Sequence, residues 1–229
     1  MMERGSISVK VEGQFACFSR PEFKVERVSY PIITPSAARG LLEAIFWRPA
    51  IRYEIRRIGV LRLGGQTVIL RNEIEDRQGR SPLIIEEKRQ QRSSLILKDV
   101  AYLIEAAVIL RPHATDPLPK YLDQIERRIA RGQYYHCPYL GTREFAADFS
   151  PPNGEQPPTL DLRLGTMLFD LAFVESRTRR DMTFMRPGRD EPVDGYARAL
   201  YFESTVNAGW IDIPAAKYQE IYRLENGDV

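Results

Sequence analysis

The chain has 229 residues, with 33 Lys or Arg against 31 Asp or Glu, two His and two Cys, and a formal net charge of only +2. No run approaches the roughly 20 apolar residues of a membrane-spanning helix, and the first residues lack the apolar stretch of a signal peptide, so we expect a cytoplasmic protein. Two cysteines and two histidines are too few for a disulfide framework or a zinc site, and we predict no metal and no cofactor.

The basic residues comprise 27 Arg and only 6 Lys. Arg pairs bidentately with carboxylate and phosphate, so this ratio favours phosphate recognition. GC-rich codon usage or a thermophilic surface would produce the same ratio, and composition alone leaves these alternatives open.

The first predicted elements are a strand and a helix. Ile7, Val9 and Val11 alternate with polar residues, which is the pattern of a half-buried strand. Thr34 can cap a helix that has Pro35 at its first position. Apolar residues at helical spacing continue that helix to residue 45, and Pro49 requires it to end before that point.

Residues 51–63 alternate between apolar and charged side chains, which predicts a strand with a basic face or a hairpin edge. A short strand is expected at 67–70. Residues 72–94 carry ten charged side chains around a small apolar patch, and we predict a mobile excursion from the sheet there. The chain returns to the core at 95–110, with a buried strand at 100–104.

A second amphipathic helix is predicted over 119–130, because Tyr121, Leu122, Ile125 and Ile129 share one face. The Pro-rich stretch 150–158 is the strongest linker signal, and strands are expected at 167–174 and 199–206, on either side of the Arg-rich stretch 177–189. This order predicts an α+β fold: a ferredoxin-like (RRM-like) domain over residues 1–150, followed by a small antiparallel β-rich part over 151–229.

Neither a Gly-rich phosphate loop nor a G-x-S-x-G turn is present, which disfavours nucleotide-hydrolysing enzymes and serine hydrolases. Basic residues are instead interleaved with aromatic ones in two stretches, 15–30 and 120–136. Cations for the backbone and rings for unpaired bases are typical of a single-stranded nucleic-acid surface. The same rings would also serve in a core, and the pattern does not distinguish the two.

A metal-free RNA cleavage site needs a cation to stabilise the phosphorane and a group that exchanges protons near the 2′-hydroxyl. Lys120 and Tyr121, at the start of the second helix, are candidates for these roles, and His136 is a second candidate proton carrier. The competing interpretations are a solvated Lys120, a core Tyr121 and a His136 that is merely a loop residue.

Several long segments resemble one family: 16–30, 34–45, 47–52, 71–74, 91–92, 97–102, 131–133, 138–145 and 201–211. End to end, the chain resembles the Cas-five family of CRISPR-associated proteins, in the "d" (also "c") type of subtype I-C. The resemblance implies a RAMP-superfamily fold, with a ferredoxin-like domain, a β-hairpin excursion and a C-terminal antiparallel sheet.

The resemblance also implies an activity. Family members cleave the CRISPR repeat in precursor RNA without metal, using the 2′-hydroxyl as nucleophile and leaving a 2′,3′-cyclic phosphate. They then stay bound to the 5′ handle of the mature guide RNA, in Cascade, the type I-C interference complex. The implied partners are therefore repeat RNA, guide RNA and the backbone and large subunits of Cascade.

The catalytic pattern of the family is only partly kept. Phe46 stands where relatives have Tyr or His, a Lys-His pair of relatives falls on Lys120-Tyr121, and a further His is replaced by Ala107. The leading hypothesis is an endoribonuclease with a catalytic set of Lys120, Tyr121, His136 and the Phe46 position. The alternative is a catalytically weak or inactive RNA-binding scaffold.

The residues expected to bind RNA lie in the two basic stretches and in the family-like segments. They are Arg20, Lys24, Arg27, Arg39, Arg71, Arg92, Arg127, Arg128 and Arg131. Duplex DNA binding, by the excursion at 72–94 or by the stretch 177–189, is a third interpretation.

Overall fold

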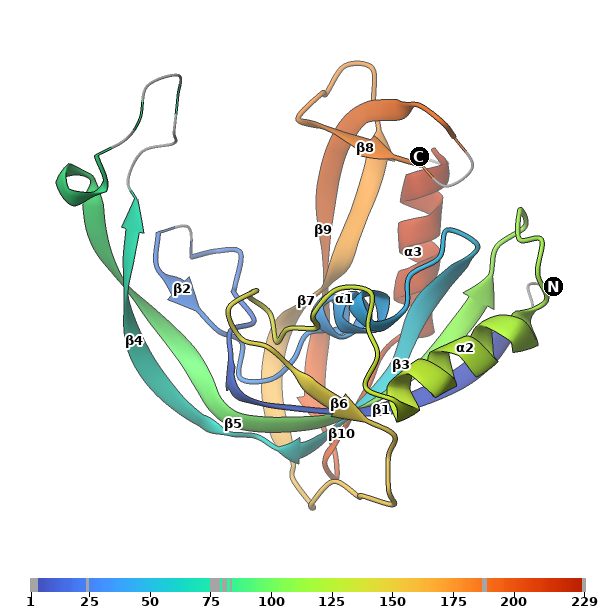
Figure 1. Ribbon diagram of the computed structural model, residues 1–229, viewed down its shortest axis with the longest axis horizontal. Coiled ribbons are helices and arrows are strands. Elements are labelled where there is room, and N and C mark those ends of the chain that lie inside the picture. The colour runs from blue at the N-terminus through green and yellow to red at the C-terminus, as the bar shows by residue number, and fades with distance from the viewer. Residues whose placement is uncertain are drawn as a thin grey trace.

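One seven-stranded, mostly antiparallel sheet forms the base of the fold in this computed structural model, which describes residues 4–23, 25–74, 79, 82, 84–186 and 189–227 (Figure 1). Its main path runs β10-β3-β5-β1-β6, and β2 and β4 pair with β5 beside this path. The bounds are β1 Arg4–Ala16, β2 Arg27–Val28, β3 Ile51–Arg62, β4 Gly65–Ile74, β5 Arg89–Leu110, β6 Asp148–Ser150 and β10 Trp210–Asp212.

Two helices with the predicted positions pack against this sheet, α1 (Pro35–Ile45) on β3 and α2 (Leu118–Ala130) on β1. Thr34 caps α1 as expected, because its hydroxyl accepts a hydrogen bond from the amide of Ala37. In α2 the buried side chains are Leu118, Tyr121, Ile125 and Ile129. The predicted apolar face is therefore confirmed except at Leu122, which is only partly buried.

The excursion expected at 72–94 is in part regular structure. β4 and β5 pair without interruption from Gly65 opposite Lys98 to Ile74 opposite Arg89, so residues 72–74 and 89–94 belong to a two-stranded ladder. We call β4 and residues 89–98 of β5 the arm, which curves away from the sheet in Figure 1. A 3-10 turn, η1 (Ile85–Glu87), precedes β5, and residues 75–78, 80, 81 and 83 lie outside the described part.

The strand predicted at 51–63 is confirmed as β3, but not as an edge. Its residues Arg57, Ile58 and Gly59 pair with β10 on one side while β5 pairs along the other. The charged residues of β3 are not all exposed to solvent, because Glu54 is only 1% exposed. Its carboxylate lies 3.1 Å from Arg56 and accepts a hydrogen bond of 2.7 Å from the Tyr222 hydroxyl.

The C-terminal part contains a second sheet, in the order β7-β9-β8, and a helix, α3. The strands are β7 (Leu162–Glu175), β8 (Met182–Met185) and β9 (Pro192–Val206), and α3 (Ala215–Asn226) packs on β7. The strands predicted at 167–174 and 199–206 are confirmed, whereas β8 and α3 were not predicted. α1 packs on β7 as well as on β3, so both sheets contribute to one buried cluster.

None of the helices in the described residues is long and apolar enough to cross a membrane.

Candidate nucleic-acid interface

The segment 131–147, which follows α2, closes over the end of α1. The amides of Tyr135 and His136 both donate to the carbonyl of Ala44, at 2.9 and 3.0 Å. The last carbonyls of a helix lack partners within it, so these bonds satisfy the end of α1 and fix the segment there. His136 is thereby held beside Phe46, the residue that ends α1.

Further along, the same segment is anchored against the end of β1. Leu140 is fully buried, and its carbonyl accepts a hydrogen bond of 3.0 Å from the amide of Cys17. Gly141 follows with φ of +88°, and a Cβ there would lie 1.9 Å from the carbonyl oxygen of Cys17. Only glycine fits such a close backbone approach, so position 141 requires it.

Three aromatic rings of this anchored segment remain exposed: Tyr134 (51%), Tyr135 (55%) and Tyr139 (37%). Tyr139 stands between the buried Pro138 and Leu140, so the alternation directs its ring outward. Exposed rings on a fixed backbone can stack unpaired bases at little conformational cost. We call Tyr134, Tyr135 and Tyr139 the tyrosine track.

At one end of the track lies a basic group on the last turns of α2, consisting of Arg127, Arg128 and Arg131. Arg128 donates a hydrogen bond of 2.9 Å to the carbonyl of Ile45 and lies 5.3 Å from the centre of the Phe46 ring. Arg127 and Arg131 are exposed. A cation beside the C-terminus of α1 also opposes the negative end of that helix dipole, so Arg128 has a structural as well as a candidate binding role.

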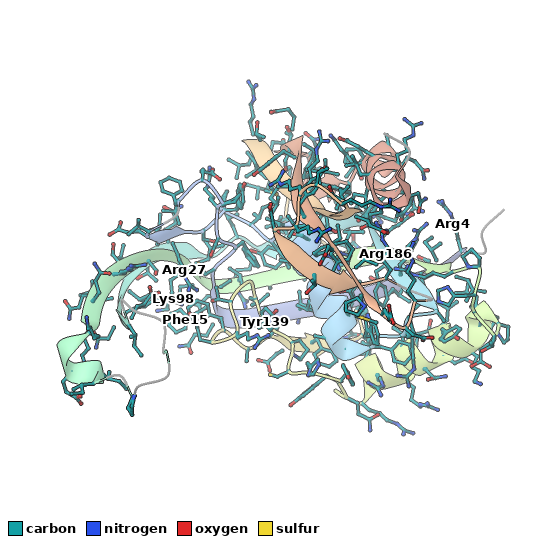
Figure 2. The ribbon with its side chains drawn as sticks, turned by 90° about the horizontal axis from the view of Figure 1, so that it is seen from above. Arg4, Phe15, Arg27, Lys98, Tyr139 and Arg186 are labelled. Carbon is teal, nitrogen blue, oxygen red and sulfur yellow. The ribbon has the colours of Figure 1, made fainter. Side chains whose placement is uncertain are left out.

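At the other end lies the arm group: Arg71 and Arg92, which are paired across the arm, and Arg20 and Arg27, before and within β2. Arg27, Arg71 and Arg92 all approach Glu73, at 3.7, 3.8 and 3.4 Å, and Arg71 also pairs with Glu144. Arg20 is joined to the same loop, because its amide donates to the carbonyl of Val28. In Figure 2 Arg27 is labelled near Lys98 of the arm, and Tyr139 is labelled on the side toward Arg186.

The two remaining residues of the predicted RNA-binding set lie apart from these groups. Arg39 makes two hydrogen bonds to Asp170, at 2.6 and 2.9 Å, and two of 2.8 Å to Glu43. It therefore bridges α1 to β7, and its RNA contact stays a prediction. Lys24 lies outside the described residues.

The expected catalytic residues do not form one cluster. Lys120 is exposed in the first turn of α2 and pairs with Asp116 at 2.8 Å. At a rise of 1.5 Å per residue it lies about 12 Å along the helix from Arg128. Tyr121 is only 6% exposed and belongs to the hydrophobic core. The backbones of Phe46 and His136, by contrast, both lie at the end of α1.

Phe46 is 1% exposed, and guanidinium groups of Arg48 and Arg128 each lie 5.3 Å from its ring centre. His136 is exposed and stands edge-on to Tyr135, with ring centres 4.3 Å apart. An exposed imidazole can exchange a proton near a bound phosphodiester. The sequence predicted Phe46, Tyr121 and His136 as members of the catalytic set. It did not predict that Phe46 and Tyr121 are buried, because their burial depends on tertiary packing.

Comparisons with known proteins identify the family. The family model for "CRISPR-associated protein (Cas_Cas5)" matches residues 6–205. A Thermus thermophilus protein named "CRISPR pre-crRNA endoribonuclease Cas5d" is 66% identical over 222 residues, covering 96% of each chain. A protein of the same name from Mannheimia succiniciproducens is 35% identical over 233 residues, covering 95% of this chain and 98% of its own.

Solved structures share the fold at low sequence identity. One, titled as a CRISPR-associated protein, has a TM-score of 0.63 and 20% identity, and covers 95% of this chain and 96% of its own. A functionally uncharacterized protein from Streptococcus mutans has a TM-score of 0.62 and 18% identity, with the same coverage. Together with the match over residues 6–205, the two relatives establish that this chain belongs to the Cas5d family of CRISPR-associated proteins.

Proposed function

We propose that this protein is an endoribonuclease that cleaves CRISPR precursor RNA without metal and stays bound to the 5′ handle of the guide RNA within Cascade. The observation that carries the proposal is the tyrosine track with a basic group at each end. A single RNA strand requires that combination, with rings for its bases and cations for its phosphates. The 66% identity to a protein named for this activity supports the choice of substrate.

For the chemistry, we assign proton exchange at the 2′-hydroxyl to His136 and charge stabilisation of the phosphorane to Arg128 and Arg131. The amide of His136 and the guanidinium group of Arg128 bind the consecutive carbonyls of Ala44 and Ile45, and the His136 ring is exposed. Lys120, on the same helix but about 12 Å away by helical rise, is assigned to a phosphate further along the strand. Tyr121, being buried, is assigned to holding α2 on the sheet.

The test is cleavage of the cognate repeat RNA in EDTA by the purified wild type and by His136→Ala and Lys120→Ala. Loss of one proton-exchanging group typically costs roughly 10²–10⁴ in rate. We expect that loss for His136→Ala, and weaker binding with a smaller rate effect for Lys120→Ala. If the wild type leaves the RNA uncut, the proposed endoribonuclease activity is refuted. If Lys120→Ala loses more rate than His136→Ala, Lys120 rather than His136 takes part in the chemical step.

The second candidate function is a scaffold that binds the repeat without cutting it. The burial of Phe46 and Tyr121 favours it, because neither side chain reaches the solvent where a strand would bind. In that case the repeat RNA binds with a salt-dependent affinity and stays intact.

The strand order β6-β1-β5-β3, with α1 and α2 packed on the sheet, supports a ferredoxin-like arrangement for the first part of the chain. We retain the division into residues 1–150 and 151–229, together with the cytoplasmic location, as parts of the proposal. Residues 151–161 support the boundary, because they contain no helix or strand.

The arm is proposed to contact a neighbouring Cascade subunit. Val68 and Leu70 of β4 point the same way and are 61% and 71% exposed, and Ile74 is 47% exposed. Contiguous exposed apolar side chains are a feature of protein interaction sites. Leu70→Glu would then abolish copurification with that subunit, while cleavage of free repeat RNA persists.

A further inference from the structure

A cavity separate from the tyrosine track lies between α1, β3, β7, β8 and α3, and its volume is about 350 Å³. Five of its lining residues are arginines: Arg39, Arg48, Arg52, Arg111 and Arg186. The three carboxylates that line it are Glu43, Asp170 and Glu225. A volume of this size accommodates a small ligand.

The carboxylates do not neutralise these arginines evenly. Glu43 and Asp170 both bind Arg39, which donates four hydrogen bonds to them. Glu225 is the third lining carboxylate, and Arg186 also approaches Glu175, outside the cavity lining, at 3.7 Å. The lining therefore holds five guanidinium groups and three carboxylates, two of which bind Arg39.

Arg111 is the lining residue that most favours an anion in this cavity. Its Nε atom is buried and has no hydrogen-bond partner in the part of the chain that the structure describes. Burial, and then the charge of nearby Arg52, lower the pKa of its guanidinium group. Two cations beside a cavity repel each other, and an oxyanion placed between them would relieve both the repulsion and the buried donor.

Arg52 is held in place by aromatic packing. Its guanidinium carbon lies 3.5 Å from the ring centre of Tyr222, whose hydroxyl is fixed on Glu54. Trp47, which follows the end of α1, also lines the cavity and is 49% exposed. Guanidinium groups and an exposed ring in the lining of one cavity suit a phosphate joined to a base.

We propose that this cavity binds one nucleotide of the bound RNA, with its phosphate on Arg52 and Arg111 and its base against Trp47. The proposal rests on the RNA-binding function above but concerns a different surface. Phe46 and Trp47 are consecutive, so α1 ends between the tyrosine track and the cavity. A strand passing the end of α1 could reach both.

The test titrates the full-length protein with adenosine 5′-monophosphate, adenosine and inorganic phosphate, and follows tryptophan fluorescence and heat release. We expect the monophosphate to bind and quench Trp47, adenosine to fail, and inorganic phosphate to bind more weakly than the monophosphate. Trp47→Phe should abolish the quench while heat release persists. Arg111→Gln should weaken monophosphate binding roughly ten- to hundredfold, as expected for a lost charged hydrogen bond.

The matched control is Arg223→Gln, which removes an exposed arginine from the last turn of α3, outside the cavity lining. It should bind the monophosphate as the wild type does. Arg186→Gln serves as a second cavity variant if Arg111→Gln does not fold, and it should weaken binding in the same direction.

The proposal is overturned if the wild type does not bind the monophosphate, or if a folded cavity variant binds it unchanged. Equal affinity for inorganic phosphate would overturn the assignment of the base to Trp47. Repeat RNA cleavage is measured on the same preparations, so that the two proposals are tested separately. A wild type that binds the monophosphate but does not cut the RNA would contradict the proposed endoribonuclease activity and would support the cavity site.

Discussion

At the residue scale, the position of the tyrosine track depends on Gly141. Its φ of +88° is strained for any other residue, and a Cβ would collide with the carbonyl of Cys17 at 1.9 Å. Because this carbonyl belongs to the backbone, it cannot rotate away as a side chain would. We expect Gly141→Ala to lower the free energy of unfolding by more than about 3 kcal/mol, measured by denaturant titration.

Gly132 provides the control, since its φ is +61° but an added Cβ would meet nothing within 4 Å. Gly132→Ala should therefore cost only the backbone strain, about 1–2 kcal/mol. Equal losses for the two variants would show that the close approach to Cys17 contributes nothing. Gly141→Ala should in addition weaken RNA binding, because Tyr139 lies two residues away.

The pair of Arg39 and Asp170 is the second test at this scale. The carboxylate of Asp170 is 4% exposed and takes two hydrogen bonds from Arg39. Removal of one partner of a buried pair leaves the other charge without compensation, which typically costs about 3–5 kcal/mol. We expect that loss for Arg39→Met in thermal or denaturant unfolding.

The double variant Arg39→Met with Asp170→Leu removes both charges and should recover most of the stability. If the double variant is as unstable as the single one, the pair is not what joins α1 to β7. Binding of repeat RNA by the double variant also tests the predicted RNA contact of Arg39, which the bridge does not require.

Sequence reasoning succeeded at individual residues where the signal is local. Thr34 caps α1 because the cap depends only on its neighbours along the chain. The sequence pattern did not predict the burial of Glu54, whose alternating position suggests a solvated face. That burial depends on Tyr222 of α3, which is distant in the sequence. Likewise, the core position of Tyr121 was an open alternative that only packing could decide.

At the scale of elements, the arm should contribute to RNA affinity through charge rather than shape. Arg92 is in the exposed part of the ladder, where it is bonded to Gln90 and lies 3.4 Å from Glu73. We expect Arg92→Gln to weaken repeat RNA binding and to reduce the slope of log affinity against log salt by about 0.7, the value for one phosphate contact on a single strand.

Fluorescence anisotropy at several salt concentrations measures this slope, and Arg223→Gln on α3 is again the charge-matched control. A slope unchanged by Arg92→Gln would mean that the carboxylate of Glu73 holds the arginine when RNA is bound. Stability should change by less than about 0.5 kcal/mol, because the residue lies on the surface.

The elements that sequence reasoning missed are short or weakly patterned. β8 has four residues and β10 has three, too few for an alternation to be recognised. The helix α3 begins after Pro214 without a side-chain cap, and only Tyr218, Ile221 and Leu224 are buried in it. The long strands, by contrast, were predictable from continuous alternation or apolar runs, as in β1 and β5.

At the scale of the whole molecule, the abundance of arginine has several uses. The net charge is only +2 because 31 Asp and Glu residues nearly balance the 33 Arg and Lys residues. Some arginines are used in fixed pairs, such as Arg57 with Glu105 at 2.6 Å. Others lie together at the end of α2 and around the cavity. Composition indicated phosphate recognition, but only the fold separates the structural arginines from those available to a strand.

The two parts of the chain are joined through their interiors, so we expect them to unfold together. The amide of Ile55 in β3 donates a hydrogen bond of 2.7 Å to the hydroxyl of Tyr218 in α3, and β10 adds a strand to the large sheet. In addition, α1 packs on both sheets. A fragment of residues 1–150 would expose these contacts and should not fold alone.

Thermal unfolding of the full chain should therefore give one transition, with coincident curves from far-ultraviolet and near-ultraviolet circular dichroism. Two separated transitions, or a soluble fragment of residues 1–150 with native-like spectra, would contradict this expectation and establish 151–229 as an independent domain. Arg39→Met should lower the midpoint of the single transition without splitting it. α1 carries both Arg39, which binds β7, and the carbonyl of Ala44, which holds His136. A weaker contact between α1 and the second sheet would therefore also disturb the proposed site of RNA cleavage.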